Sequence, residues 1–183
     1  MVRQNWQMWS GALNDVQINQ IIQSAGQTNE ASTFNAQGAL EISKIRKSRV
    51  AWLTDNKPIL DMLFDFVDTA NKNVFNLSIF KQADIQYTEY LGSEGGHYSW
   101  HHDIDWNRND GFDRKISVTV QLSNPNEYEG GSFSFSETES PDDRCKEKGT
   151  VLVFPSYLQH AVQPVTSGTR KSLVAWFEGP RWQ

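Results

Sequence analysis

The chain has only one cysteine and no long run of apolar residues. That single thiol, Cys145, cannot form a disulfide within the chain, and one free cysteine is typical of a reducing compartment. No segment approaches the roughly 18 apolar residues that a membrane span requires, and the first residues lack the apolar core of a secretion signal. We therefore expect a cytoplasmic protein without a membrane partner.

Positive charge is also scarce in this sequence. The 17 lysines and arginines are outnumbered by 22 aspartates and glutamates, which gives a net charge of -5. Binding to a nucleic-acid backbone requires a concentrated basic surface. The nearest approach to such a surface is the short run at residues 44–49, which we interpret as a solvated strand edge or loop. Nucleic acid is therefore not an expected partner.

The 183 residues suffice for one domain with a substantial core, and a 12% aromatic content supplies bulky side chains for it. No internal repeat or domain boundary is visible, so we expect a single domain over residues 1–183. Apolar residues recur at helical spacing in two segments, which predicts helices over residues 14–25 and 57–71. Asn14 or Asp15 is the expected cap of the first helix, and Thr54 or Asp55 that of the second.

Beyond residue 76, short apolar stretches alternate with Gly, Pro, Asn and Ser, which indicates strands separated by turns. The predicted strands lie at residues 77–80, 84–90, 98–103, 115–122, 132–136, 150–154, 161–165 and 172–178. This pattern predicts a mainly β fold, either a jelly roll or a barrel, braced by N-terminal helices. The polar segment 104–114 is either a cover over a substrate or a plain solvated loop.

The histidines are concentrated in one place. Three of the four lie within residues 97–102, and the fourth is His160. Along a strand, residues two apart point to the same side, so His101 and Asp103 share a face. Together with His160 they match the two-histidine, one-carboxylate set that binds Fe(II) on one face and leaves the opposite positions open. Ordinary polar residues at strand ends are the alternative interpretation.

Other members of this histidine-rich segment rank lower as ligands. His102 points to the opposite side of the strand from His101, and His97 lies beside two glycines, where a loop is expected. Asp105 shares the face of Asp103 but lies where the strand is expected to end. We keep it as the second choice for the carboxylate.

Arg170 follows His160 by ten residues. If residues 166–168 form the turn of a hairpin, Arg170 lies across from Pro164, roughly 13 Å from His160 along the strand. A five-carbon diacid that chelates the metal at one end can then meet the guanidinium at the other, because the planar fork binds a carboxylate through two hydrogen bonds. Ser172 can add a hydroxyl contact to the same carboxylate. Trp176 is an even number of residues from Arg170 on the same strand, so it either lines the pocket or is an ordinary core residue.

Taken together, four segments resemble a known family: residues 9–13, 98–103, 122–131 and 160–170. The chain is similar over most of its length to the prolyl 4-hydroxylase-like branch of the Fe(II)/2-oxoglutarate-dependent dioxygenases, in particular to the PKHD-type hydroxylases of bacteria and phages. The resemblance implies a double-stranded β-helix, or jelly roll, with iron held by His101, Asp103 and His160. It also implies that Arg170 receives the distal carboxylate of 2-oxoglutarate.

Two further pocket residues follow from this resemblance. Relatives often carry a tyrosine ahead of the ligand strand that lines the co-substrate pocket, and Tyr90 fits that place best. Where many relatives have a tyrosine or phenylalanine on the central strand, this chain has Gln121. The wall of the pocket is therefore expected to differ there from that of the relatives.

The resemblance implies an oxygenase that couples decarboxylation of 2-oxoglutarate to hydroxylation of a C–H bond, with release of succinate and CO2. The favoured substrate is a prolyl or other side chain of a peptide or protein, while small molecules stay open, and ascorbate is a candidate reductant. A non-catalytic, zinc-binding jelly roll of the cupin kind is the alternative, since the same ligands suit zinc. A nucleic-acid demethylase is disfavoured by the acidic charge balance. The sequence leaves the oligomeric state open.

Overall fold

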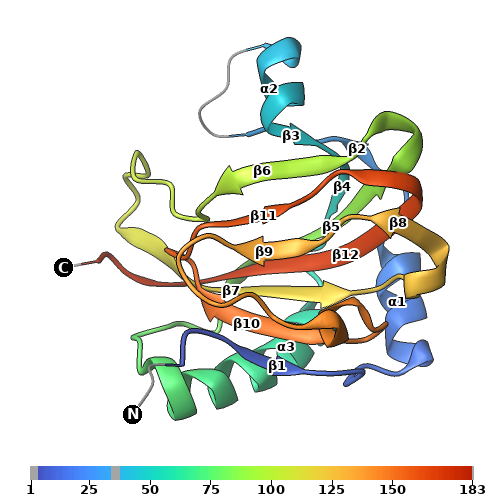
Figure 1. Cartoon of the computed structure of the whole chain (residues 1–183). Coiled ribbons are helices and arrows are strands. Elements are labelled where there is room, and N and C mark those ends of the chain that lie inside the picture. The colour runs from blue at the N-terminus through green and yellow to red at the C-terminus, as the bar shows by residue number, and fades with distance from the viewer. Residues whose placement is uncertain (1–3, 34–37, 183) are drawn as a thin grey trace.

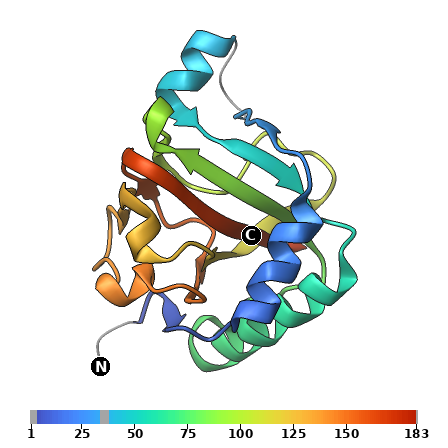
Figure 2. The same cartoon turned by 90° about the vertical axis from the view of Figure 1, so that its right-hand side faces the viewer.

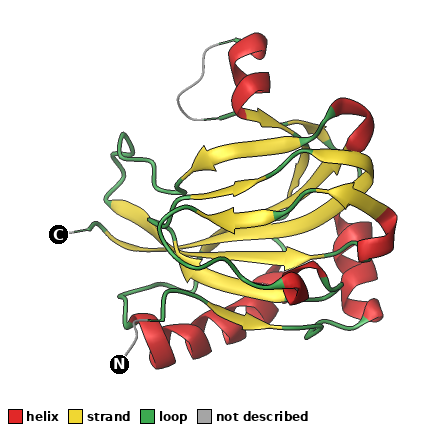
Figure 3. Cartoon of the chain, viewed as in Figure 1, coloured by secondary structure: helices red, strands yellow, loops and turns green. Residues whose placement is uncertain are grey.

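The computed structural model describes residues 4–33 and 38–182, which form two facing antiparallel sheets (Figures 1 and 3). The larger sheet has the order β1-β10-β7-β12-β5-β4-β2, and β8 pairs with β12 off this path. Its strands are β1 (Gln7–Trp9), β10 (Val151–Pro155), β7 (Phe112–Gln121), β12 (Val165–Pro180), β5 (Ala83–Leu91), β4 (Arg49–Trp52), β2 (Asn29–Glu30) and β8 (Tyr128–Gly130). The smaller sheet has the order β3 (Arg46–Lys47), β6 (His97–His101), β11 (His160–Val162), β9 (Phe133–Phe135). The predicted mainly β jelly roll is confirmed.

Two helices, α1 (Asp15–Ala25) and α3 (Lys57–Ala70), cover the outer face of the larger sheet (Figure 2). The Asn14 side chain caps α1 and forms a capping box with Gln17. Asn56 caps α3, one or two residues later than predicted. Both predicted helices are therefore confirmed, and α3 continues into a single π-helical turn over Asn71–Phe75. Of the helices in the described residues, none combines the length and the apolar character that a membrane crossing requires.

Alternation along β12 separates the core from the space between the sheets. Leu173 and Phe177 are buried in the core beneath the helices. Residues of the opposite parity, among them Arg170 and Trp176, line a pocket that faces the smaller sheet. A strand of period two thus has one face for stability and another for chemistry.

One predicted strand is wrong, and one segment is less exposed than predicted. Residues 77–80 form no strand, because the Asn71 side chain binds both the N–H and the C=O of Leu77 at 2.8 Å and so occupies the groups that a ladder needs. The run at residues 44–49 includes a strand edge, as predicted, because β3 is the edge strand of the smaller sheet, but the run is not solvated throughout. It spans the end of a third helix, α2 (Ala39–Ile45), all of β3 and the start of β4, and the Arg46 side chain points inward and is only 6% exposed.

The predicted hairpin at residues 166–168 is also wrong. These residues belong to the 16-residue strand β12, which pairs first with β8 and then with β5, so Arg170 lies across from Tyr90 and not from Pro164. Gly168 does have a positive φ, +67°, as glycines in turns commonly do. Its role is different: a Cβ atom there would lie 2.0 Å from the Glu127 carbonyl oxygen, so glycine permits the close passage of β12 over β8.

Replacement of Gly168 by alanine tests this account of the close approach. We expect the free energy of unfolding to fall by about 3 kcal/mol, because a positive φ costs roughly 1 kcal/mol and the backbone contact adds roughly 1–3 kcal/mol. Gly26→Ala is the matched control, since Gly26 has a φ of +56° but a Cβ atom there would meet no neighbouring atom within 4 Å. It should lose only about 1 kcal/mol. Equal losses in chemical denaturation would contradict the close approach.

Candidate metal centre

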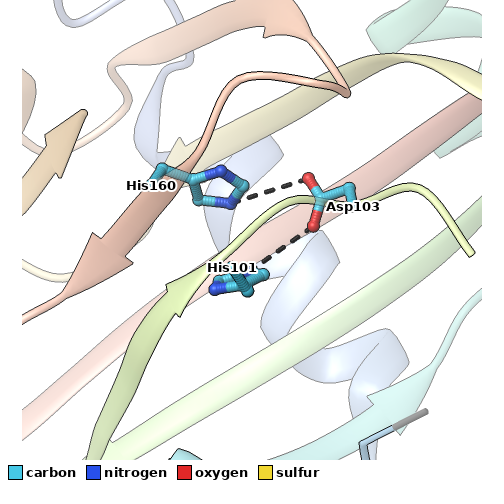
Figure 4. A group of neighbouring side chains, drawn as sticks. All are labelled: His101, Asp103 and His160. Atoms are coloured by element: carbon cyan, nitrogen blue, oxygen red, sulfur yellow. Dashed lines mark ion pairs between the residues drawn. The ribbon is translucent and has the colours of Figure 1, made fainter. Parts of the chain in front are cut away.

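Three side chains meet between the sheets: His101, Asp103 and His160 (Figure 4). Their ligand atoms all lie within 4.8 Å of one another. His101 and His160 are directly paired residues of the neighbouring strands β6 and β11, so the backbone ladder sets their separation. Asp103 lies in a bend just after β6, and its backbone N–H donates to the Ser156 carbonyl at 3.0 Å. Its carboxylate oxygens lie 3.5 Å from His101 Nε2 and 3.6 Å from His160 Nε2.

The backbone fixes the tautomer of both histidines. His101 Nδ1 lies 2.8 Å from the Ser99 carbonyl, and His160 Nδ1 lies 2.9 Å from the Leu158 carbonyl. A carbonyl oxygen only accepts, so each Nδ1 carries the proton and each Nε2 keeps its lone pair. Both lone pairs then belong to the atoms that lie near Asp103. Such outer hydrogen bonds are typical of histidines that bind metals.

A buried serine pair supports the carboxylate. The Ser117 hydroxyl donates to Asp103 at 2.6 Å and lies 2.9 Å from the Ser156 hydroxyl. Burial by itself raises the pKa of Asp103, but the charge of His160 and the contacts with His101 and Ser117 outweigh burial and hold that pKa well below its usual range. Burial lowers the pKa of His160 to about 4. At neutral pH the pair is a carboxylate beside a neutral imidazole, which is the state that binds metal.

Tyr98 is a neighbour of the candidate ligands that the sequence did not indicate. Its ring is stacked on that of His101, with ring centroids 3.4 Å apart and an interplanar angle of 12°. The two residues are three apart, yet they share a face because a bulge shifts the register between the His101–His160 pair and the Tyr98–Val162 pair. Burial raises the pKa of Tyr98 to about 12. The phenol therefore stays neutral. Because its ring is stacked on that of His101, it also restricts rotation of the imidazole.

The ligands lie in a pocket lined by both sheets. Phe133 and Phe154 pack beside the His160 ring at centroid distances of 5.5 and 4.9 Å and make the ligand side of the pocket apolar. Of the residues predicted as co-substrate contacts, Tyr90, Arg170, Ser172 and Trp176 line the pocket. Gln121 is not among the lining residues. Its amide donates to the Tyr128 hydroxyl at 2.9 Å and to the Ser123 carbonyl at 3.2 Å.

Arg170 is a buried guanidinium on the larger sheet, opposite the candidate ligands His101 and His160 of the smaller sheet. It is 5% exposed, and its guanidinium carbon lies 5.6 Å from the centre of the Tyr90 ring. No carboxylate forms an ion pair with it among the residues that the structure describes. Gly131 makes room for its stem, since a Cβ atom there would lie 2.9 Å from Arg170 Cδ. This contact explains why the second glycine of the 122–131 motif, Gly131, has to be a glycine.

A second pocket cation, Arg46, was missed because its basic neighbours suggested a solvated segment. Its Nε donates to the Ser48 hydroxyl at 2.8 Å and its Nη2 donates to Gln86 Oε1 at 2.7 Å. The guanidinium carbon lies 4.6 Å from the centre of the Tyr98 ring. The indole N–H of Trp176 is also buried here and has no hydrogen-bond partner within the described chain. Both groups line the pocket that holds the three ligands.

The lower-ranked ligand candidates lie outside the cluster. His97 contacts the Gly95 and Lys44 carbonyls, His102 is exposed, and the Asp105 carboxylate accepts a hydrogen bond from the Asn107 backbone. The 104–114 segment is tied to the larger sheet, because Arg108 forms ion pairs with Glu178 and Asp110.

Comparisons with known proteins agree with this site. The model of the 2OG-Fe(II) oxygenase superfamily matches residues 85–178, slightly more than half of the chain. The chain therefore belongs to this superfamily, and the predicted family is confirmed. Among curated proteins it is 30% identical over 132 residues to a PKHD-type hydroxylase of Aliarcobacter butzleri (strain RM4018), an alignment that covers 69% of this chain and 58% of that relative. The chain thus spans less than two thirds of that relative's length.

Solved prolyl hydroxylases share the fold. A viral collagen prolyl hydroxylase from Paramecium Bursaria Chlorella virus-1, solved as a 2OG complex, superposes with a TM-score of 0.67 at 21% identity, over 96% of this chain and 97% of the other. A prolyl hydroxylase of Trichoplax adhaerens, in complex with a hypoxia inducible factor peptide fragment, gives 0.71 at 18% identity, over 94% and 83%. At these identities the likeness establishes the fold alone.

The depressed pKa of His160 predicts how pH affects the metal-free chain. The folded-state pKa of about 4 lies below the ordinary value of 6.5, so the unfolded chain binds more protons between these two values. Acidification from pH 6.5 to 4 should therefore lower the melting temperature. His160→Gln should reduce this dependence. His102→Asn, a change at an exposed histidine whose charge is the smallest of the causes that lower the pKa of His160, should change it far less. Identical pH slopes for wild type and His160→Gln in thermal denaturation would contradict the buried neutral imidazole.

Proposed function

We propose that this protein is an Fe(II)- and 2-oxoglutarate-dependent oxygenase that hydroxylates a C–H bond. The observation that carries the proposal is the convergence of two Nε2 lone pairs and one carboxylate on a shared point. Two imidazoles and a carboxylate on one face are the donor set of non-haem Fe(II) oxygenases. The residues present therefore fit the metal that the superfamily requires.

In this proposal His101, Asp103 and His160 hold the iron and leave its other positions open. Ser117 keeps Asp103 ionised and oriented, and the stacked Tyr98 ring prevents His101 from turning away. The side chains of Phe133 and Phe154 exclude water from the ligand side of the pocket. When bound, iron and 2-oxoglutarate together activate dioxygen for attack on an unactivated C–H bond, with succinate and CO2 as the other products.

Arg170 is the proposed anchor of the distal carboxylate of 2-oxoglutarate. It is buried in the same pocket as the metal ligands but comes from the opposite sheet, so a short diacid can bridge the two. A planar guanidinium binds a carboxylate through two parallel hydrogen bonds. Ser172 and Tyr90 line the pocket beside it and are the proposed additional contacts. A structural zinc site has no use for a buried cation opposite the metal.

The proposed substrate is a prolyl or other side chain of a peptide or protein. This proposal is supported by the PKHD-type name of the curated relative and by the fold shared with prolyl hydroxylases, one of which was solved with a peptide. We retain ascorbate as a candidate reductant and the cytoplasm as the proposed compartment.

Anaerobic addition of Fe(II) and 2-oxoglutarate tests the site through the weak visible charge-transfer band of the chelate. Wild-type protein should develop the band, and His101→Ala should not. Arg170→Gln should raise the 2-oxoglutarate concentration for half-saturation by about tenfold or more, because a charge-assisted hydrogen-bonded pair is lost.

Arg144→Gln is the matched control, since its side chain is 62% exposed and lies outside the pocket. It should bind 2-oxoglutarate as the wild type does. Absence of the band in wild-type protein that binds zinc tightly would favour the structural-zinc alternative.

A further inference from the structure

Arg46 is a buried cation without an acidic partner. It is 6% exposed, and its two hydrogen bonds go to neutral acceptors, Ser48 and Gln86. No ion pair joins it to a carboxylate within residues 4–33 and 38–182. An arginine stays charged even when buried, and an uncompensated buried charge is costly. The two neutral contacts need only a neutral donor, so they do not explain the charge. The Tyr98 ring, whose centre lies 4.6 Å from the guanidinium carbon, offsets the charge only in part and carries no negative charge of its own.

The charges in the pocket do not balance, even with the co-substrate bound. This step rests on the proposed function. Asp103 is the only acidic side chain among the described lining residues, and Arg46 and Arg170 are the two cations. A ferrous ion adds two positive charges, and a bound dicarboxylate removes two and satisfies Arg170. The charge of Arg46 is then left over, next to the metal ligands.

Unpaired donors surround a second hollow beside the first. This hollow shares Arg46, Tyr98, Asp103 and Trp176 with the metal pocket, so it opens toward the reacting centre. The Trp176 indole N–H and the Thr33 hydroxyl line it, and both are buried without a hydrogen-bond partner in the described structure. Another lining cation, Arg114, already pairs with Asp84 at 2.9 Å. The hollow therefore offers one uncompensated charge and donors that lack an acceptor.

We propose that Arg46 binds a carboxylate of the substrate and thereby selects substrates that carry an acidic group close to the hydroxylated carbon. A carboxylate supplies both the missing negative charge and the missing acceptors. Arg46 is then a specificity-determining residue on the smaller sheet, and Arg170 anchors the co-substrate on the larger one. Peptides with aspartate or glutamate beside the target residue are the substrate class that this arrangement fits.

Anaerobic calorimetry on the protein loaded with Fe(II) and 2-oxoglutarate tests this assignment without turnover. The probes are blocked dipeptides in matched pairs: acetyl-Pro-Asp-amide against acetyl-Pro-Asn-amide, acetyl-Asp-Pro-amide against acetyl-Asn-Pro-amide, and the corresponding glutamate and glutamine pairs. Wild-type protein should bind the acidic member of at least one pair about tenfold more tightly. Arg46→Gln should reduce that preference to less than about twofold.

Arg49→Gln is the matched control. It removes the same charge three residues away, from a side chain that is 41% exposed, pairs with Glu94 and lies outside both hollows. It should keep the acid preference. Arg46→Gln should also keep its melting temperature, since a charge retained for binding and not for folding can be removed without loss of stability.

Equal binding of both members of every pair by wild-type protein, including no binding of either, contradicts the inference. A preference that survives Arg46→Gln contradicts it as well. A tenfold loss of 2-oxoglutarate affinity in Arg46→Gln would assign this arginine to the co-substrate and overturn the inference. Failure of the proposed function is distinguishable, because wild-type protein would then show no charge-transfer band with Fe(II) and 2-oxoglutarate.

Discussion

The antiparallel pairing of β6 with β11 is the constraint on which the site depends. It sets His101 directly across from His160, although 58 residues separate them in the chain. Backbone hydrogen bonds therefore determine the spacing of the two imidazoles before any metal binds. The bend after β6 then returns Asp103 toward both rings, anchored through the Ser156 carbonyl. A site built on paired strands is rigid, and rigidity is what a chelating site needs.

The space between the sheets can hold buried charged groups because the largest apolar core packs against the outer face of the larger sheet. Alternate residues of β12 pack beneath α1 and α3, which leaves the other residues free for chemistry. Among the described lining residues, the result is a pocket with two buried guanidiniums and a single carboxylate. Such an arrangement is costly in the empty protein, and anionic ligands relieve that cost. The same electrostatic logic thus accounts for both proposed binding roles.

The fold and the site could be predicted from the sequence mainly where the relevant residues are close together in the chain. The alternation from Arg170 to Trp176 is local, and the structure places these residues on one face of β12. Strand parity does not bring His101 and Asp103 together, because β6 ends at His101 and Asp103 lies in the bend that follows. The hairpin prediction failed because a glycine with positive φ also occurs inside a strand, as Gly168 does in β12, where it pairs with Tyr128. Contacts that depend on long-range packing gave no local signal. Arg46 is the clearest case. Its basic neighbours in the sequence predict a solvated side chain, whereas the fold places Gln86 and Tyr98 against its guanidinium.

The most direct test of the central claim is X-ray absorption at the iron edge of anaerobic protein loaded with one equivalent of Fe(II). The account predicts a site of nitrogen and oxygen ligands with two imidazoles, which falls to one imidazole in His160→Ala. A wild-type spectrum without two imidazole ligands, or one that His160→Ala leaves unchanged, would contradict it.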